Sequence, residues 1–456
     1  MSSSNHAINA RSRSSEVTLG RQTVPGRRTI IQGWVESFRA APLFGLALVF
    51  YMGLPSSVIF SEDGANMLSA WHPAYPGWYD LVYLSLAAGG FTLSRLRLPS
   101  GAVLICGFLL LSILISIGFS GTYPTLASAA FFDPLLYWLR FSLTFVCVTA
   151  ITEKHGTRTT SDILFVVGLV LMASSVFVFR LQYPEFNRVY ASGMTVGSFG
   201  QVLLILSLVA MLGNNLGMML ISLAFLILTF SRTDLLLWVG SLLYFLFTRS
   251  KMRLGRRGLY GVLVLLLFVS STFILLRYPE FRFVIYDRLD LADIFTMNRR
   301  TDVWQYGIDL LMSRSVPLFG IGFNCSPSVL LDFTSLPSDE ANRVFSFPSF
   351  HSIVFEYAIG LGVLSVPIFA VLFWRIRKAW RSKSHVSFYI YTLFVLSQSF
   401  DFCFYRPKEV IIWAAFLGLA EGEMARQRKR TQTLSRSFAS NPSPLAPGRG
   451  EEATLS

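Results

Sequence analysis

Long apolar blocks alternate with short polar segments along most of the chain. The blocks approach the roughly 20 apolar residues that a helix needs to cross the hydrocarbon core of a membrane. Their apolar positions are continuous and do not form the one-sided stripe of a helix on a soluble protein. The pattern therefore predicts an all-α, polytopic transmembrane bundle of about twelve helices, near 43–60, 79–94, 101–119, 131–151, 162–181, 195–213, 216–230, 234–248, 258–276, 350–374, 386–402 and 409–422.

Lysine and arginine residues are concentrated in every second segment between these blocks, for example at 249–257, 375–383 and 426–430. Because cytoplasmic loops carry an excess of Lys and Arg, we predict that these segments and both termini face the cytoplasm. The remaining segments then face outward, and 277–349 is the one long segment among them.

The domain organisation follows from these two patterns. We predict a basic cytoplasmic arm at 1–40 and nine transmembrane helices at 41–276. A large outward loop with an amphipathic helix follows at 277–349, then three further transmembrane helices at 350–424 and a disordered cytoplasmic tail at 425–456. The tail is rich in Ser, Pro and Arg, which is typical of disorder.

Composition supports the membrane assignment, because 53% of the residues are hydrophobic and only 14% are charged. The net charge of +13 does not indicate nucleic-acid binding, since the basic residues lie in short loops where orientation and lipid contacts explain them. The four cysteines lack the spacing of a metal site, and no Gly-rich phosphate loop or metalloprotease motif occurs. We therefore expect no nucleic acid, metal or cofactor. Whether Cys325 and Cys403, both predicted to face outward, form a disulfide is left open.

Arginines are unusually frequent on the predicted outward face, where the charge bias of membrane proteins disfavours them. One such arginine more often pairs with a nearby carboxylate, but the set fits a phosphate-containing ligand, whose oxygens match the guanidinium fork. Arg232 stands out because it lies in a very short turn between two predicted membrane helices, although it could also anchor a helix end at the interface. The outward arginines are Arg180, Arg188, Arg232, Arg277, Arg282, Arg288, Arg299, Arg300, Arg314 and Arg343.

Residues 298–323 are predicted to form an amphipathic helix followed by a rigid turn. Val303, Trp304 and Ile308 contribute to an apolar face, and a segment that starts at Pro317 and contains two glycines ends the helix. Such a helix would lie on the outer membrane surface and cover the bundle.

Two further polar features lie at or within the predicted helices. His351 is at the outer end of the block near 350–374 and suits proton removal from a hydroxyl, because an ordinary histidine titrates at about pH 6.5. A polar anchor is the commoner role of a lone interfacial histidine. Asp133 and Arg140 are seven positions apart and therefore share a helix face. We interpret them as a structural contact between helices in preference to the lining of an inner polar cavity.

Four motifs resemble, in their order, the O-antigen ligases and Wzy-type polysaccharide polymerases of bacteria, over about residues 231–362. They are Ser231-Arg232-Thr233 before a membrane helix, Arg300 with Trp304 in an Arg-x-x-x-Trp pattern, Pro317 to Phe323 with Gly320 and Gly322 in a Pro-x-x-Gly-x-Gly pattern, and His351-Ser352 followed by Gly360 and Gly362. The chain departs from the family at Arg299, where Gly is common, and at Ser352, where Asn is common. These departures leave the subfamily open.

The resemblance implies a metal-independent glycosyltransferase of the bacterial inner membrane, with 277–349 as a periplasmic loop. It would polymerise or transfer undecaprenyl-diphosphate-linked glycans on the periplasmic face, for exopolysaccharide or O-antigen biosynthesis. Its partners would be this donor, an acceptor glycan or lipid, membrane lipids, and export or chain-length proteins. The implied roles are catalysis for His351, diphosphate binding for Arg232, Arg300 and Arg188, and support for Trp304, Gly320 and Gly322.

Three alternatives remain at the level of sequence. A polymerase is favoured over a ligase, but no residue decides between them. A secondary transporter or flippase for an anionic glycolipid is disfavoured, because transporters often contain repeated halves and the repeat here is limited to Tyr183-Pro184-Glu185-Phe186 and Tyr278-Pro279-Glu280-Phe281. A non-catalytic scaffold of an export complex would leave His351 and the arginines dispensable.

Overall fold

The computed structural model of the chain describes helices and short connections and leaves several segments undescribed. The described residues are 30–54, 78–120, 127–182, 189–191, 194, 196–229, 231–248, 300–312, 316–322, 350–400, 402 and 407–440. Every secondary-structure element among them is helical, which confirms the predicted all-α class. The predicted helix near 258–276, most of the loop 277–349, Cys325 and Cys403 lie outside the described residues.

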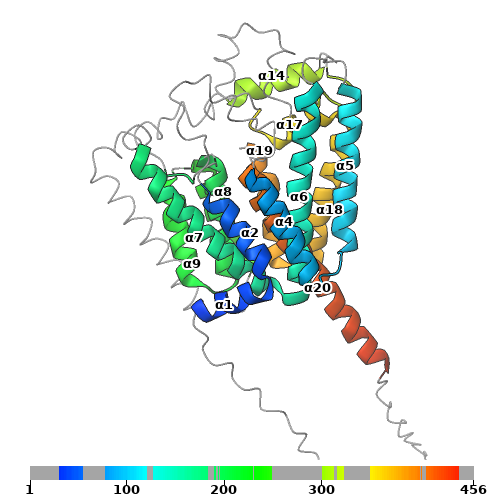
Figure 1. Cartoon of the computed structure of the whole chain (residues 1–456). Helices are drawn as coiled ribbons and strands as arrows, with labels where there is room; N and C mark the ends of the chain where they lie inside the picture. The colour runs from blue at the N-terminus through cyan, green and yellow to red at the C-terminus, as the bar shows by residue number, and fades with distance from the viewer. Residues whose placement is uncertain are drawn as a thin grey trace, which may run out of the picture.

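The other predicted blocks coincide with helices of the structure (Figure 1). These helices are α2 (Pro42–Gly53), α4 (Trp78–Leu93), α5 (Ser100–Ser120), α6 (Ala127–His155), α7 (Thr157–Gln182), α8 (Val196–Leu212), α9 (Leu216–Leu228), α10 (Arg232–Thr248), α17 (Ile353–Leu361) with the 3-10 turn η3 (Gly362–Leu364) and α18 (Ser365–Arg381), α19 (His385–Phe400) and α20 (Pro407–Ser440).

Several described helices are long and apolar enough to cross a membrane. Four segments pass this criterion, namely Ser100–Phe119, Pro134–His155, Thr157–Arg180 and Ile353–Arg381. A fifth span results if α2 and the preceding helix, Ile31–Ala40, are counted as one bent span. The others, such as α8 and α9, are apolar but shorter. A multi-pass membrane protein is therefore supported, whereas the count of about twelve spans stays a prediction.

A helix is present at the predicted position as α14 (Arg300–Met312); of the predicted apolar face, Val303 is buried whereas Ile308 is exposed. The helix lies across one end of the bundle, roughly perpendicular to the neighbouring upright helices, and contacts α17 (Figure 1). The first described helix, α1 (Ile30–Ala40), and the C-terminal part of α20 lie at the opposite end. The described parts of the two termini thus lie at the end of the bundle opposite α14 (Figure 1), and the predicted topology, which places the termini and the loop that contains α14 on opposite sides, stays a prediction.

The structure differs from the sequence-based expectation at both ends of the bundle. Residues 30–40 were assigned to a polar arm, but they form α1, which packs against α7 and is bent by 110° from α2. The bend occurs at Ala41, since a residue that precedes a proline, here Pro42, disfavours helical backbone. At the other end, α20 continues to Ser440, so the expectation of a disordered tail from residue 425 is wrong for the part up to Ser440.

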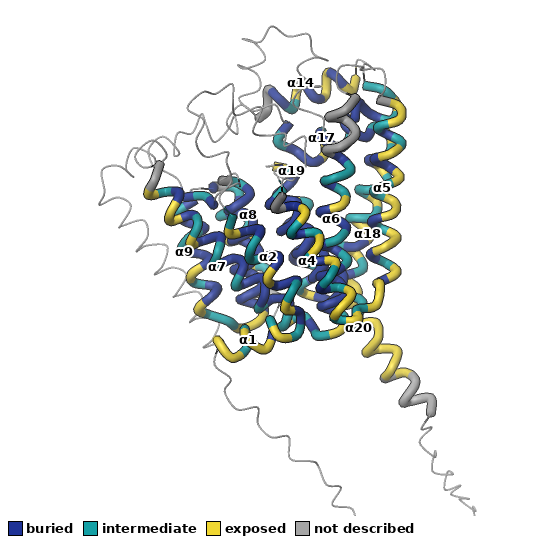
Figure 2. The backbone as a smooth tube through the Cα atoms, viewed as in Figure 1, coloured by how far each residue is buried: buried dark blue, intermediate teal, exposed yellow. Residues whose placement is uncertain are grey.

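Helices α6 and α20 form the most extensive contact of the bundle. Gly418 and Gly422 of α20 face α6, and a side chain at either position would collide with backbone oxygens of Phe145 or Thr149. Two glycines four residues apart allow helix backbones to approach closely, a device common in membrane bundles. The outer faces of α5 and α18 are instead exposed (Figure 2), as expected of lipid-facing surfaces.

Arg140 forms a buried ion pair, but with a partner that the sequence did not indicate. Its guanidinium donates two hydrogen bonds to Asp80 of α4, at 2.8 and 2.7 Å, and Tyr51 of α2 donates to the same carboxylate at 2.8 Å. Both charged side chains are almost completely buried. Asp133 is two helical turns from Arg140, about 10 Å along the axis, and its side chain lies outside the described residues. Arg140 therefore makes a contact between helices, as interpreted, with a carboxylate on another helix.

Candidate active site

The backbone just before His351 is fixed by two side chains. The indole nitrogen of Trp304 in α14 donates a hydrogen bond to the carbonyl oxygen of Phe350 at 2.9 Å. The amide of Phe350 donates to the carboxylate of Glu356 in α17 at 2.7 Å. Phe350 is fully buried, and a Cβ added to Gly307 of α14 would lie only 3.2 Å from its ring. Two helices thus hold both polar backbone groups of the residue that precedes the predicted catalytic histidine.

His351 itself has an uncommon backbone conformation. Its φ angle is 50°, in the left-handed region that non-glycine residues seldom adopt. Such conformations persist where the surroundings determine them and are frequent at functional sites. His351 is half-buried, and Ser352 follows in an extended conformation as the N-cap of α17. The imidazole is therefore carried on a short bend that directly precedes α17, next to a residue whose backbone is held by Trp304 of α14.

The two glycine motifs dock against each other through the backbone. Ile321 and Gly322 donate to the carbonyl oxygens of Ile359 and Gly360 at 3.0 and 3.1 Å. Val363 donates to the carbonyl of Leu318 at 2.9 Å. The turn after α14 is thereby attached to the point where α17 ends and η3 begins.

Glycine is required at this docking surface for two reasons. Gly320 and Gly362 have φ angles of 80° and 57°, which glycine adopts without steric cost. A Cβ on Gly320 would lie 2.2 Å from the carbonyl oxygen of Gly360, and one on Gly362 would lie 2.2 Å from that of Leu318. The predicted supporting role of Gly320 and Gly322 is therefore given a physical basis, although their part in function remains a proposal.

The predicted diphosphate-binding arginines are described only in part. Arg188 lies outside the described residues. Arg232 and Arg300 are the first residues of α10 and α14, and their side chains are not described. Backbone N–H groups at a helix N-terminus attract anions, so an arginine at that position adds to a positive potential. This placement of both residues is compatible with phosphate binding.

A buried polar layer connects the ends of α8, α10, α19 and α20. Ser231 donates to Asp234, Ser198 donates to Glu409, and Gln398 donates to Gln201 at 2.6 Å. The ammonium group of Lys408 donates to the carbonyl oxygens of Met52 and Leu54 at the C-terminal end of α2, at 3.0 and 2.6 Å. A cation at that position satisfies carbonyls that the helix leaves free.

Sequence reasoning missed Glu356, Asp234 and Glu409. Each is a carboxylate in or next to an apolar segment, and a charged residue in such a segment is a functional or structural signal in itself. That signal would have identified all three. Their hydrogen-bond partners lie on other elements or outside their own helix, which the sequence does not reveal. Within the described ranges, no three His, Cys, Asp or Glu side chains are placed to share a metal ion.

The long apolar helices define the class of this protein as an α-helical, multi-pass membrane protein. Helix α14 lies across one end of its bundle (Figure 1). A family model described as O-antigen ligase matches residues 217–370, which extend from α9 into α18 and include α10, α14 and the turn that carries His351. This match, over about a third of the chain, confirms the resemblance to the O-antigen ligase and Wzy-type family that the motifs predict. No curated protein matches the chain.

The match supports an O-antigen ligase-like or polymerase-like activity in general, and hence an enzyme of the glycosyltransferase type with a membrane-associated glycan substrate. It covers the elements in which the histidine, the glycine turns and two of the three predicted arginines occur.

Proposed function

We propose that the chain is an inner-membrane glycosyltransferase that acts on undecaprenyl-diphosphate-linked glycans at the periplasmic face. The donor sugar would be transferred to a hydroxyl group of an acceptor glycan or lipid, without a metal ion. The observation that carries this proposal is the constrained turn at His351, which lies inside the region that matches the O-antigen ligase family.

The reaction needs a base near the acceptor and positive charge near the leaving group. The acceptor hydroxyl oxygen attacks the anomeric carbon of the donor while the bond from that carbon to the diphosphate oxygen breaks. The electron pair of the broken bond leaves with the diphosphate, and His351 takes the proton of the hydroxyl. The turn held by Trp304 and Glu356 supports this role, because it restricts where the imidazole can lie.

The arginines would stabilise the negative charge that develops on the departing diphosphate. Positive groups that are in place before the reaction stabilise such charge most effectively. Arg232 and Arg300 begin helices α10 and α14, where the helix ends also favour anions. We assign Arg188, which lies between α7 and α8 in the sequence, to the same task.

The assignment of Arg232 predicts a difference between arginine and lysine. Arg232→Lys keeps the charge but loses the planar fork that matches a diphosphate, so we expect transfer to fall by at least about tenfold at equal protein levels. The measurement is the turnover of purified enzyme with a lipid-linked donor. Arg158→Lys, at an exposed position near the N-terminal end of α7 on the predicted cytoplasmic side, is the matched control and should keep the parental rate. Full activity of Arg232→Ala would restrict this arginine to anchoring a helix end.

A strain that lacks the protein distinguishes a polymerase from a ligase. The measurement is the length of its glycans and the molecule to which they are attached. We favour the polymerase, for which long chains on the lipid carrier should disappear while single repeat units accumulate. Long chains that persist on the carrier without reaching their final acceptor would identify a ligase instead. Accumulation of the lipid-linked unit on the cytoplasmic side would contradict both and indicate a flippase.

A further inference from the structure

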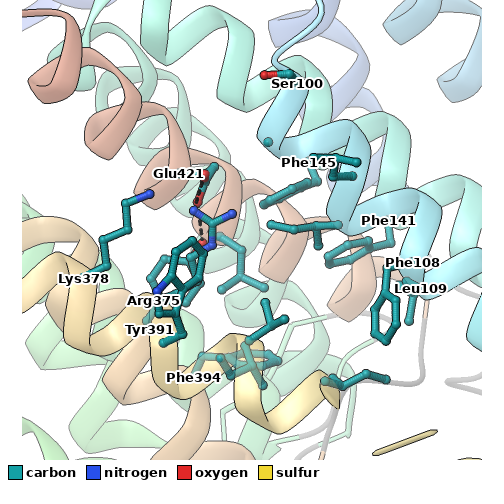
Figure 3. Close-up of a pocket in the computed structure, with 18 of the residues that line it drawn as sticks. Ser100, Phe108, Leu109, Phe141, Phe145, Arg375, Lys378, Tyr391, Phe394 and Glu421 are labelled. Carbon is teal, nitrogen blue, oxygen red and sulfur yellow. Dashed lines mark hydrogen bonds and ion pairs between the residues drawn. The ribbon is translucent and has the colours of Figure 1, made fainter.

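A cavity of about 510 Å³ lies between α5, α6, α18, α19 and α20, and Tyr357 of α17 also lines it (Figure 3). It includes residues in the C-terminal part of α18, such as Lys378, and Arg428 in the C-terminal part of α20. These parts lie toward the end of the bundle opposite α14 (Figure 1). The cavity therefore has a basic end away from the candidate active site, and nothing in the proposed function uses it.

The basic end of the cavity carries more positive than negative charge. Arg375 donates to Glu421 at 2.8 Å, and this pair is drawn in Figure 3. Lys378 and Arg428 line the same cavity, so two cations remain beyond this ion pair. The guanidinium of Arg375 and the ammonium of Lys378 lie 4.7 and 4.9 Å from the ring centroid of Trp374, an aromatic side chain that positions both cations.

One polar atom at this end is buried and has no partner. Among the described residues, the Nε atom of Arg375 has no hydrogen-bond partner, although the side chain is only 7% exposed. A buried donor of this kind costs free energy unless an acceptor is supplied. Arg375 lies among the residues that line the cavity (Figure 3), so its positive charge adds to the potential that a ligand there would meet.

The rest of the cavity is apolar and reaches the lipid-facing surface. Phe108, Phe141, Phe145 and Phe394 line it (Figure 3). Leu104 of α5, which also lines it, is 72% exposed, and α5 carries many exposed residues (Figure 2). A ligand with a hydrocarbon chain can therefore enter sideways from the bilayer.

We propose that this cavity binds one phospholipid with an anionic headgroup. Its phosphate accepts hydrogen bonds from Lys378 and Arg428 beside the buried charge of Arg375, and an acyl chain lies along the phenylalanines between α5 and α18. The excess of two cations selects an anionic headgroup over a zwitterionic one, whose own ammonium group would face them. Under the predicted topology the lipid belongs to the cytoplasmic leaflet. The inference does not depend on the proposed glycosyltransferase activity.

A lipid-linked donor fits this cavity less well than a structural phospholipid. Helix α17, which directly follows His351, lies toward the α14 end of the bundle (Figure 1). A diphosphate held at Lys378 and Arg428 would place its sugar at the other end, away from the histidine. We therefore assign the cavity to a phospholipid.

The test uses the purified full chain, delipidated in detergent and titrated with phosphatidylglycerol or phosphatidylcholine, with bound lipid counted by native mass spectrometry. We expect tight binding of one phosphatidylglycerol and at least tenfold weaker binding of phosphatidylcholine. Lys378→Gln and Arg428→Gln should each weaken phosphatidylglycerol binding about fivefold, the usual effect of one basic residue near an anionic headgroup. The control is Arg430→Gln, an exposed position of the same helix outside the cavity, which should bind as the parent does.

A second variant tests the apolar part. Leu104→Trp should fill the mouth and abolish the bound phosphatidylglycerol, and an unchanged melting temperature of the lipid-free protein would show that the fold is intact. Equal binding of the two phospholipids, or an equal loss in Arg430→Gln, would overturn the proposal. A polyprenyl phosphate that phosphatidylglycerol cannot displace would also overturn it, because the cavity would then belong to the carrier lipid.

Discussion

At the scale of single residues, the position of His351 is determined by its neighbours. Trp304 donates a hydrogen bond to the carbonyl of Phe350, and Glu356 accepts one from its amide. The backbone of the residue that precedes His351 is therefore fixed in one orientation. The positive φ angle of His351 is accepted because these contacts fix the residue before it and α17 fixes the residues after it. Sequence placed the histidine at a helix end but gave no reason for its fixed geometry.

Replacement of His351 tests its role as a base. His351→Gln should lose 10²–10⁴-fold in turnover, the usual contribution of a positioned base, while the protein still inserts and binds the donor. The rate of the parent should fall toward acid pH, because only a neutral imidazole can accept a proton. A pH–rate profile of purified enzyme with lipid-linked donor measures both effects.

The control for this experiment is His385→Gln at the start of α19, on the predicted cytoplasmic side, which should keep the parental profile. A parental rate that rises toward acid pH would contradict the role of a base, even if His351→Gln is inactive. That result would indicate a protonated histidine that holds a phosphate.

Trp304 provides a test of the positioning of the turn. Trp304→Phe keeps an aromatic ring between Phe355 and Phe400, which the indole contacts, but removes the donor to Phe350. The loss of one hydrogen bond to a buried carbonyl costs about 1 kcal/mol of stability. We expect a larger effect on turnover, about tenfold, with the donor KM nearly unchanged. Trp380→Phe, at an exposed position of α18, is the control. Equal turnover of the two variants would show that Trp304 does not position His351.

At the scale of elements, the docking of two turns explains why the glycine motifs occur together. The turn after α14 and the break between α17 and α18 share three hydrogen bonds between backbone groups. Neither turn can take a side chain at Gly320 or Gly362 without a collision. The helix over the bundle end and the helix that follows His351 are thus joined by the glycine turns as well as through Trp304.

Gly320→Ala should separate these two turns. The new Cβ would lie within 2.2 Å of the carbonyl oxygen of Gly360, and alanine also disfavours the left-handed backbone by about 1–2 kcal/mol. We expect a lower melting temperature in detergent and the loss of most activity. Gly107→Ala in α5 is the control, because a Cβ at that position meets nothing within 4 Å. A parental melting temperature for Gly320→Ala would show that the turns separate without cost.

At the scale of the whole molecule, the bundle has two different ends. One carries α14 and the turn of His351, and the other carries α1 and the C-terminal part of α20 (Figure 1). The basic residues Arg375, Arg377 and Arg381 lie in the C-terminal part of α18, on the side predicted to be cytoplasmic. The fold therefore separates the proposed transfer chemistry from the proposed phospholipid site.

The orientation of these ends is tested by cysteine labelling. In a variant that lacks the four native cysteines, Ser335→Cys should react with an impermeant reagent from outside the cell membrane. Ser382→Cys should react only after permeabilisation, because the basic loop that contains it is predicted to be cytoplasmic. Labelling of both positions from the same side would contradict the predicted topology.

The sequence by itself determined most of the described helices and, through its motifs, the resemblance to the family. In a membrane every backbone polar group must be satisfied within the structure, so a long apolar block becomes a helix whatever surrounds it, as α5 and α6 show. The motifs at Arg232, Trp304, Gly320 and His351 were likewise readable, because each is a short local pattern. Residues 30–40 were misread, since α1 is stabilised by its packing on α7 and not by an apolar block.

Only the tertiary structure decided which polar groups meet. Arg140 pairs with Asp80 from α4, Glu356 binds the amide of Phe350, and Arg375 lies beside Glu421 from α20. Most of these partners come from different helices, so their meeting depends on how the helices pack against one another. A buried charge without a partner is costly. Which charges are buried, and which partners they find, depends on how the helices pack, and the order of residues along the chain does not show this.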